Sequence, residues 1–408
     1  MKTGFKICLV VLAFVFTAFW GPRPEGLFGE ELLCPAGKRV GAFEFLGGVF
    51  QPSVVTTSTG RVMVFAQGRI NTSADHADKV LVYTYSDNNG RTWSGPRFLT
   101  SPGCFWGIGT YVSRTPAGKE KISVMFTYGK KELFRRYDGA DLERLFDIDK
   151  SDYGDDCAAF LYRLTSTDDG KTWQGRAVKN DIMGRYYDAD GKYLAFFSPI
   201  GQTHVIKEGP WKGRYIIGGP LKGNDSGPVS DARTIYDYKD DGSCLVYSDD
   251  RGETWRFAGA APPGGNEASA VSIKGGQRIM MVRRRNEKGP RIVNYSDDCG
   301  KTWTKNRELG EVPGTRCLGV TKKYGDVLMM SVPQDNWPRR KGWTGYSRDN
   351  GKTWQGKTVQ QGLFSYSDFA RLPDNESYIV VYSHGHHGEF GLYAKRFKEE
   401  WLFGEKGQ

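Results

Sequence analysis

The sequence predicts an all-β fold, and more closely a six-bladed β-propeller, from a repeated octapeptide, the spacing of its copies and the abundance of glycine. The octapeptide reads Ser-x-Asp-x-Gly-x-Thr-Trp and occurs five times in the 408 residues, with Asn88 in place of the aspartate in the first copy. Self-similar segments of this kind are typical of folds in which each repeat is one supersecondary unit. The copies occupy residues 86–93, 166–173, 248–255, 296–303 and 347–354.

Each octapeptide is expected to close a β-hairpin. An aspartate side chain can accept hydrogen bonds from amides of its own turn, and glycine adopts the positive φ that a tight hairpin needs. The tryptophan then buries a large aromatic surface and anchors the turn. Strand-like runs precede three of the copies, at residues 79–85, 158–164 and 290–295.

The spacing of the copies predicts the number of blades. The last two intervals between copies are 48 and 51 residues, and a four-stranded blade takes about 50 residues. The two longer intervals hold extra chain, notably the polar stretch 130–156. Five copies, together with a blade closed by the two chain ends, predict six blades. The 53 glycines and the 13% aromatic content suit many short strands and tight turns.

The N-terminus reads as an export signal. Lys2 and Lys6 supply positive charge, and residues 7–20 form an uncharged apolar run of fourteen, which is short beside the roughly 20 residues that span a bilayer. We expect residues 1–21 to be a signal peptide and residues 22–408 to form a single propeller. The mature protein is then periplasmic or extracellular, with no membrane span. An uncleaved anchor is the alternative.

Charge and cysteine content restrict the possible partners. The formal net charge is +10, which can steer anionic substrates toward a cleft. The basic residues form no dense run of the kind that nucleic-acid-binding proteins carry, so we expect no nucleic-acid partner. In an exported protein some cysteines can form disulfides, but the sequence does not indicate which ones pair. Six cysteines follow the predicted signal: Cys34, Cys104, Cys157, Cys244, Cys299 and Cys317.

No metal site is expected. The cysteines show no CxxC spacing, and the cluster His384, His386 and His387 has no obvious partner segment. Tetrahedral metal sites need ligands that converge with suitable geometry.

The octapeptide resembles the Asp box of the sialidase superfamily, and this resemblance extends over nearly all of residues 22–408. It implies a six-bladed propeller whose active site lies at the central channel. Asp boxes are structural, lie away from that site and also occur in proteins that are not enzymes. The candidate function therefore depends on other segments.

Two of these segments resemble the nucleophile pair of sialidases. Residues 365–369, Ser-Tyr-Ser-Asp-Phe, are similar to the family's Ala-Tyr-Ser-Asp-Leu element, which implies that Tyr366 is the nucleophile. Glu267, in Gly-Asn-Glu-Ala-Ser, stands in the place of the glutamate that activates this tyrosine. The anomeric carbon of a sialoside carries a carboxylate, so a neutral phenol avoids the repulsion that an anionic nucleophile would meet.

A third segment resembles the acid/base element. Residues 66–69, Ala-Gln-Gly-Arg, are similar to the family's Ala-Glu-x-Arg, which a short loop and an aspartate follow. The resemblance implies that Asp75 is the acid/base, with Asp78 as the alternative because the loop length is ambiguous. Such a group protonates the leaving oxygen and then activates water. Arg69 matches a family residue that lines the same side of the pocket.

Sialidases bind the substrate carboxylate with three arginines, because guanidinium groups match carboxylates in shape and stay charged. The second of these matches Arg285, and Arg283 and Arg284 leave the register open. The third matches Arg339, with Arg340 as its competitor.

The first arginine is missing. The family's Phe-Arg-Ile-Pro reads Val-Phe-Gln-Pro at residues 49–52, which places Phe50 where arginine is expected and makes Gln51 a candidate for partial substitution. The family's Leu-Tyr-Glu element, whose glutamate steadies that arginine, reads Val-Tyr-Ser and ends at Ser383. Loss of both partners of an ion pair indicates a remodelled pocket, because losing only one leaves a buried charge uncompensated.

These features together predict an exo-acting retaining glycoside hydrolase, resembling exo-α-sialidases, that needs no cofactor. Its expected substrate is a glycan with a terminal sialic acid or a related acidic sugar. The alternatives are a carbohydrate-binding or catalytically degenerate propeller, and a glycosidase for a different sugar.

Overall fold

The computed structural model describes residues 25–42, 44–74, 77–100, 103, 105–129, 159–182, 195–223, 242–336, 338–386 and 389–404. The described strands form five sheets. The largest contains β1 (Leu27–Cys34), β2 (Leu46–Thr56), β3 (Val62–Ile70), β4 (Lys79–Ser86), β5 (Arg97–Phe98), β25 (Ser367–Arg371), β26 (Ser377–His386) and β27 (Glu389–Lys398). A short helix, α3 (Glu399–Phe403), follows β27.

The other four sheets follow in chain order. One contains β6 (Phe105–Arg114), β7 (Glu120–Gly129), β8 (Ala159–Ser166), β9 (Gln174–Ala177) and β12 (Ile200–Gln202). The next contains β10 (Lys179–Asn180), β11 (Ala195–Phe197), β13 (His204–Val205), β14 (Tyr215–Gly223), β15 (Gly242–Ser248) and β16 (Thr254–Ala260). The last two contain β17 (Gly265–Ile273), β18 (Arg278–Arg285), β19 (Arg291–Ser296) and β20 (Arg307–Leu309), and β21 (Val320–Tyr324), β22 (Val327–Pro333), β23 (Arg340–Ser347) and β24 (Gln355–Leu363).

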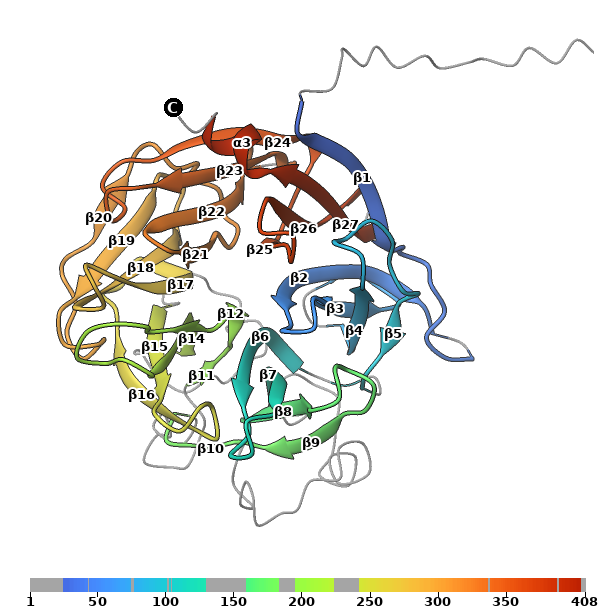
Figure 1. Cartoon of the computed structure of the whole chain (residues 1–408), viewed down its shortest axis with the longest axis horizontal. Helices are drawn as coiled ribbons and strands as arrows, with labels where there is room; N and C mark the ends of the chain where they lie inside the picture. Colours follow the sequence, from blue (N-terminus) through green and yellow to red (C-terminus); the bar gives the residue numbers. More distant parts are fainter. Residues whose placement is uncertain are drawn as a thin grey trace, which may run out of the picture.

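The sheets are arranged around a common centre (Figure 1). Their innermost strands contact one another in a closed series, in which β2 contacts β6, β12 and β25, β17 contacts β12 and β21, and β21 contacts β25. The fold is therefore all-β and propeller-like. The count of six blades stays a prediction, because a single parallel bridge between Gly48 and Phe390 joins β2 to β27 within one eight-stranded sheet.

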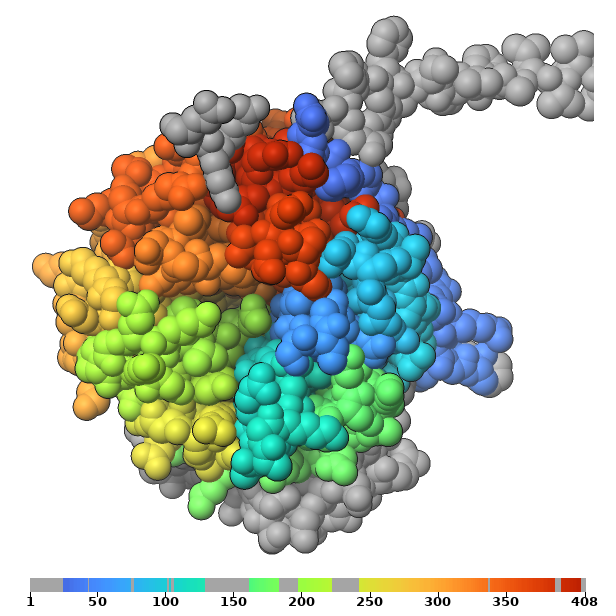
Figure 2. All heavy atoms as spheres, viewed as in Figure 1, coloured from blue at the N-terminus to red at the C-terminus, as the bar shows by residue number. Residues whose placement is uncertain are grey.

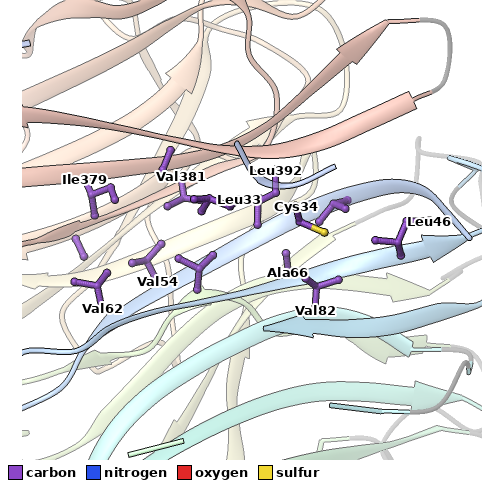
Figure 3. Packing of buried hydrophobic residues seen from close by; sticks show 14 of the residues in the cluster. Leu33, Cys34, Leu46, Val54, Val62, Ala66, Val82, Ile379, Val381 and Leu392 are labelled. Atoms are coloured by element: carbon purple, nitrogen blue, oxygen red, sulfur yellow. The ribbon is translucent and has the colours of Figure 1, made fainter. Parts of the chain in front are cut away.

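The two ends of the described chain meet in the largest sheet. β1 pairs antiparallel with β27, and in Figure 2 the blue atoms of the N-terminal strand adjoin the red atoms of the C-terminal strands. One hydrophobic cluster draws on both ends: Leu33 and Cys34 of β1 belong to it together with Val381 and Leu392 (Figure 3). Burial of such aliphatic side chains contributes about 1.5–3 kcal/mol each.

The Asp boxes form the predicted hairpin turns. The first residue of each copy is the last residue of a strand, namely of β4, β8, β15, β19 and β23. In every copy the serine hydroxyl accepts a bond from the glycine amide at 2.7–2.9 Å. The threonine amide donates to the Asp or Asn Oδ1 at 2.9–3.0 Å. The residue before the glycine also has positive φ, between 58° and 62°, which the octapeptide pattern did not indicate.

These turns give a prediction for acid stability. Burial opposes ionisation of Asp349, but hydrogen bonds from Thr353 and Ser347 outweigh it and lower the pKa of this carboxyl to about 2. Because the folded pKa lies below the unfolded value of about 3.9, the contribution to stability is present above pH ~4 and is lost as the pH falls toward 2. We expect Asp349→Asn to flatten the pH dependence of the free energy of unfolding over this range, since Asn88 occupies the same position in the first box.

Urea unfolding at several pH values between 2 and 7 measures this slope. Asp326→Asn, at an exposed position outside the Asp boxes, is the control and should leave the slope as it is. An unchanged slope in Asp349→Asn would contradict the assignment.

Four of the six cysteines that follow the predicted signal lie in the described part of the chain. Cys34, Cys244, Cys299 and Cys317 are buried, unpaired thiols, whereas Cys104 and Cys157 lie outside the described residues. Within the described part of the chain, no helix has the length and hydropathy needed to cross a membrane. The predicted signal peptide and the stretch 130–156 also fall outside the described residues.

Candidate active site

The structure brings Tyr366 and Glu267 together. The Tyr366 hydroxyl donates a hydrogen bond of 2.7 Å to Glu267 Oε1, although the two residues are 99 positions apart in the chain. Glu267 lies in β17, and Tyr366 directly precedes β25. These inner strands approach each other through β21, which contacts both. Glu267 is 7% exposed, so this bond lies largely out of water.

A β-bulge places Glu267 toward the site. In the β17–β18 ladder, Gly265 pairs with Arg285 and Ala268 pairs with Arg283, so that two residues of β17 stand opposite Arg284 alone. An extra residue of this kind re-aims the side chains of the bulged strand. Glu267 is one of the two residues in the bulge.

The three consecutive arginines of β18 have different environments. Arg284 Nε lies 3.6 Å from Glu267 Oε2, and Arg284 is 5% exposed. Arg283 is fully buried and donates to the side-chain oxygens of two asparagines at 2.9 and 2.6 Å. Arg285 forms an ion pair with Glu308 at the surface, with a third of its side chain exposed.

The expectation that Arg285 faces the site therefore needs correction, and Arg284 takes its place. Successive side chains of a strand point to opposite faces, so Arg283 and Arg285 lie on one face of β18 and Arg284 lies on the other. The motif spacing alone could not choose among the three, because the choice depends on the bulge in β17.

Arg339, the candidate for the third arginine, lies against the tyrosine. Its guanidinium carbon is 5.0 Å from the centre of the Tyr366 ring. Nη1 donates to Ser365 Oγ at 3.0 Å and Nη2 donates to the Arg316 carbonyl at 2.6 Å. Burial opposes the charge of this guanidinium, but Cys317, Tyr366 and Glu267 outweigh burial and raise the pKa of Arg339. The competing residue, Arg340, is exposed.

An aromatic contact occupies the position of the missing arginine. Phe50 is 6% exposed and packs against Phe390 with ring centroids 4.8 Å apart. The Arg69 guanidinium lies over the Phe50 ring at 4.0 Å and donates to the Ser73 carbonyl at 2.6 Å. Gln51 has a positive φ of 51°, and its buried amide oxygen finds no hydrogen-bond partner among the described residues.

Ser383, which stands where the family has a glutamate, holds the backbone at Tyr366. Its amide donates to the Tyr366 carbonyl at 3.0 Å, and its carbonyl accepts from the Ser365 amide at 2.8 Å. Ser383 is completely buried. The sequence motif predicted neither this backbone role of Ser383 nor the contact between Ser365 and Arg339. Both depend on how β26 pairs beside the loop that precedes β25.

Two other predicted features are described only in part. Asp75 lies outside the described residues, so its place as acid/base stays a prediction. The alternative, Asp78, is partly buried, and its carbonyl accepts from the Ile70 amide at 2.7 Å. His384 stacks on Tyr393 at 3.7 Å, and His387 is outside the described residues. Within the described ranges, His, Cys, Asp and Glu residues form no group of three suited to a metal ion.

The arrangement as a whole suits an anionic ligand. Arg284 and Arg339 flank a tyrosine–glutamate pair, and fixed guanidinium groups bind carboxylates well. Cys317, a buried thiol whose pKa is raised by burial, lies close enough to Arg339 and Glu267 to feel their charge. A tyrosine hydroxyl bonded to a buried carboxylate is the arrangement of an activated nucleophile.

Curated relatives and solved structures point to the same superfamily. The chain is 24% identical over 396 residues to a sialidase of Micromonospora viridifaciens, covering 94% of this chain but 56% of the relative. It is 23% identical over 309 residues to a sialidase of Paraclostridium sordellii, covering 73% of this chain and 68% of the relative. The chain thus spans little more than half the length of the Micromonospora protein.

Solved structures resemble the fold at low identity. The Hadza microbial sialidase Hz136 superposes with a TM-score of 0.64 at 18% identity, covering 87% of this chain and 66% of the other. Trypanosoma rangeli sialidase in complex with sialic acid superposes with a TM-score of 0.64 at 17% identity, covering 91% of this chain and 59% of the other. A Dyadobacter fermentans protein of unknown function superposes with a TM-score of 0.62 at 17% identity, covering 92% of this chain and 99% of the other. At these identities the likeness concerns the fold alone.

A family model settles the membership. The model described as "BNR repeat-like domain" matches residues 144–380, more than half of the chain. Four of the five Asp boxes, all except the first at residues 86–93, lie completely within the match. The chain belongs to the BNR repeat-like domain family and is a BNR protein of the sialidase superfamily.

Proposed function

We propose that this protein is a sialidase-like retaining glycoside hydrolase that releases a terminal sialic acid or a related acidic sugar. The observation that carries the proposal is the 2.7 Å hydrogen bond from Tyr366 to Glu267, flanked by the guanidinium groups of Arg284 and Arg339. The relatives described as sialidases support it. Secretion behind residues 1–21 and a six-bladed ring belong to the same proposal.

The proposed reaction has two displacements. Glu267 accepts the hydroxyl proton of Tyr366 while the phenolic oxygen bonds to the anomeric carbon and the bond to the leaving oxygen breaks. Asp75 donates the proton that this leaving oxygen takes up. Asp75 then accepts a proton from water, whose oxygen attacks the same carbon as the bond to the tyrosine oxygen breaks. Glu267 returns its proton to that oxygen and restores the Tyr366 hydroxyl. Each displacement inverts the configuration of the anomeric carbon, so the two together retain it.

The arginines define the substrate class. Arg284 and Arg339 would bind the carboxylate on the anomeric carbon, and a neutral phenol suits a carbon that carries this charge. The aromatic contact of Phe50 with Phe390 stands where a third arginine would be expected. We therefore include acidic sugars related to sialic acid among the substrates.

A second candidate is a propeller that binds acidic glycans without cleaving them. The observation in its favour is that Phe50 and Ser383 replace both members of the family's ion pair. Binding alone has no need of a tyrosine bonded to a buried glutamate, which is why hydrolysis is preferred.

Incubation of the purified chain with fluorogenic α-sialosides, and with a panel of glycosides of related acidic sugars, tests the proposal. We expect hydrolysis of at least one acidic glycoside, and the first product seen by proton NMR should have the α configuration of the substrate. A first product of inverted configuration would contradict the tyrosine mechanism. Binding of the free sugars without hydrolysis of any glycoside would favour the second candidate.

A further inference from the structure

A buried arginine outside the predicted motifs stands behind the site. Arg291, the first residue of β19, is 1% exposed. Its Nε donates to the Pro313 carbonyl at 3.1 Å. Its Nη2 donates to the Cys317 carbonyl at 2.6 Å and to Thr315 Oγ1 at 3.4 Å. Burial lowers the pKa of Arg291 to about 10, which leaves the guanidinium charged at neutral pH.

The partners of Arg291 lie in one short segment, the β20–β21 loop, defined here as residues 313–317. The loop is also held from its other side. Thr315 Oγ1 donates to the Pro333 carbonyl at 3.0 Å, and the Arg316 amide donates to Asn336 Oδ1 at 2.8 Å. Gly319 leaves room for the guanidinium, because a Cβ there would lie 3.0 Å from Arg291 Cζ.

The loop in turn contacts a residue of the candidate active site. The Arg316 carbonyl accepts the 2.6 Å hydrogen bond from Arg339 Nη2. The other terminal nitrogen of Arg339 bonds Ser365, and its guanidinium lies over the Tyr366 ring. The direction of the Arg316 carbonyl therefore sets the plane of the guanidinium that faces the nucleophile.

We propose that Arg291 is a positioning residue that orients Arg339 against Tyr366 through the β20–β21 loop. This inference rests on the proposed hydrolase function. A guanidinium suits the task because its planar fork donates in two fixed directions, to the carbonyls of Pro313 and Cys317. A lysine ammonium keeps the charge but is a flexible point donor, so it cannot hold both ends of the loop in one plane. Displacement of a binding group by about 1 Å can cost about 100-fold in rate.

The first experiment compares Arg291→Lys with Arg163→Lys. Arg163 is also 1% exposed and donates to Tyr111 and Glu253, in a different sheet and away from Arg339. Both variants are assayed below their unfolding transitions. We expect Arg291→Lys to lower kcat/KM for the hydrolysed glycoside about 10- to 100-fold and Arg163→Lys to leave it within about 2-fold. Equal losses in the two variants would overturn the proposal.

A double-mutant cycle separates positioning from general destabilisation. In an Arg339→Ala background, Arg291→Lys should cost less than about 2-fold in kcat/KM, because the residue it orients is gone. A full loss in that background would mean that Arg291 acts by another route. Asn336→Ala, which frees the Arg316 peptide from its other side, gives a second variant should Arg291→Lys fail to fold. It should lower kcat/KM about 3- to 10-fold.

A readout that needs no hydrolysis distinguishes this inference from the proposed function. Tyrosines labelled at Cζ are titrated by NMR, and Tyr366→Phe identifies the Tyr366 signal. Removing or misplacing a neighbouring cation raises a phenol pKa, so Arg291→Lys and Arg339→Ala should shift the Tyr366 titration in the same direction. If the wild-type protein hydrolysed no glycoside but both variants shifted the Tyr366 titration, the positioning role would stand and the hydrolase function would fail. No shift, with activity intact in Arg291→Lys, would overturn the positioning role alone.

Discussion

Replacing Tyr366 with phenylalanine is expected to lower kcat for glycoside hydrolysis by about 1,000-fold or more, because the variant lacks the oxygen that attacks the anomeric carbon in the proposed mechanism. The change removes one atom, and the ring beneath the Arg339 guanidinium remains. KM and thermal stability should therefore change little. Initial rates with a fluorogenic substrate, measured at saturation, give kcat directly. Glu267→Gln, which keeps the shape but cannot accept the proton, should lower kcat by about 100-fold.

The chain offers a matched control for this experiment. Tyr382 is a completely buried tyrosine of β26, the strand that pairs with β25, and its hydroxyl donates to the carboxylate of Glu30 on β1. Tyr382→Phe should reduce stability and leave kcat near the wild-type value. If Tyr366→Phe and Tyr382→Phe retained the same activity, Tyr366 would not be the nucleophile and the retaining mechanism would have to be abandoned.

The second large effect is expected at Arg284. Arg284→Lys should lower kcat/KM by about 100-fold, because it removes a planar donor that would bind the substrate carboxylate and that now lies 3.6 Å from Glu267. Arg285→Lys changes the neighbouring residue in the same way, yet Arg285 pairs with Glu308 at the surface. A surface ion pair is worth about 0–1 kcal/mol, so this control should stay close to wild type in both stability and kcat/KM.

Separate values of kcat and KM say how Arg284 acts. A rise in KM alone would indicate that it binds substrate and transition state equally, whereas a fall in kcat as well would indicate contacts that strengthen in the transition state. If Arg285→Lys were the damaged variant, the side-chain alternation along β18 that distinguishes the two arginines would be wrong.

Much of the fold followed from one local pattern. The Ser-x-Asp-x-Gly-x-Thr-Trp repeat specifies a turn through bonds within eight residues, so its geometry could be predicted at each copy. The pairing of Tyr366 with Glu267 could also be predicted, because each sits in a segment that resembles a family motif. β1 pairs with β27, which agrees with the expectation that strands from the two ends of the chain share one blade.

The arginine set could not be predicted in the same way. Which guanidinium of residues 283–285 faces the site depends on the bulge at Glu267, and a bulge is a property of two paired strands. The contribution of Arg291 depends on where the β20–β21 loop lies in space, so no spacing within the chain could indicate it. Asp75 and the number of blades stay predictions from the resemblance.

The pairing of β1 with β27 has a consequence for how the chain reaches its final form. Leu27 stands opposite Phe397, so a strand synthesised near the beginning must wait for one synthesised near the end. Contacts this distant in sequence form slowly, since the chain between them must first be ordered. Until then β27 and β1 each present an unpaired edge, which is the kind of surface through which separate chains associate. The last joint of the ring is thus also the place where one molecule could capture the strand of another.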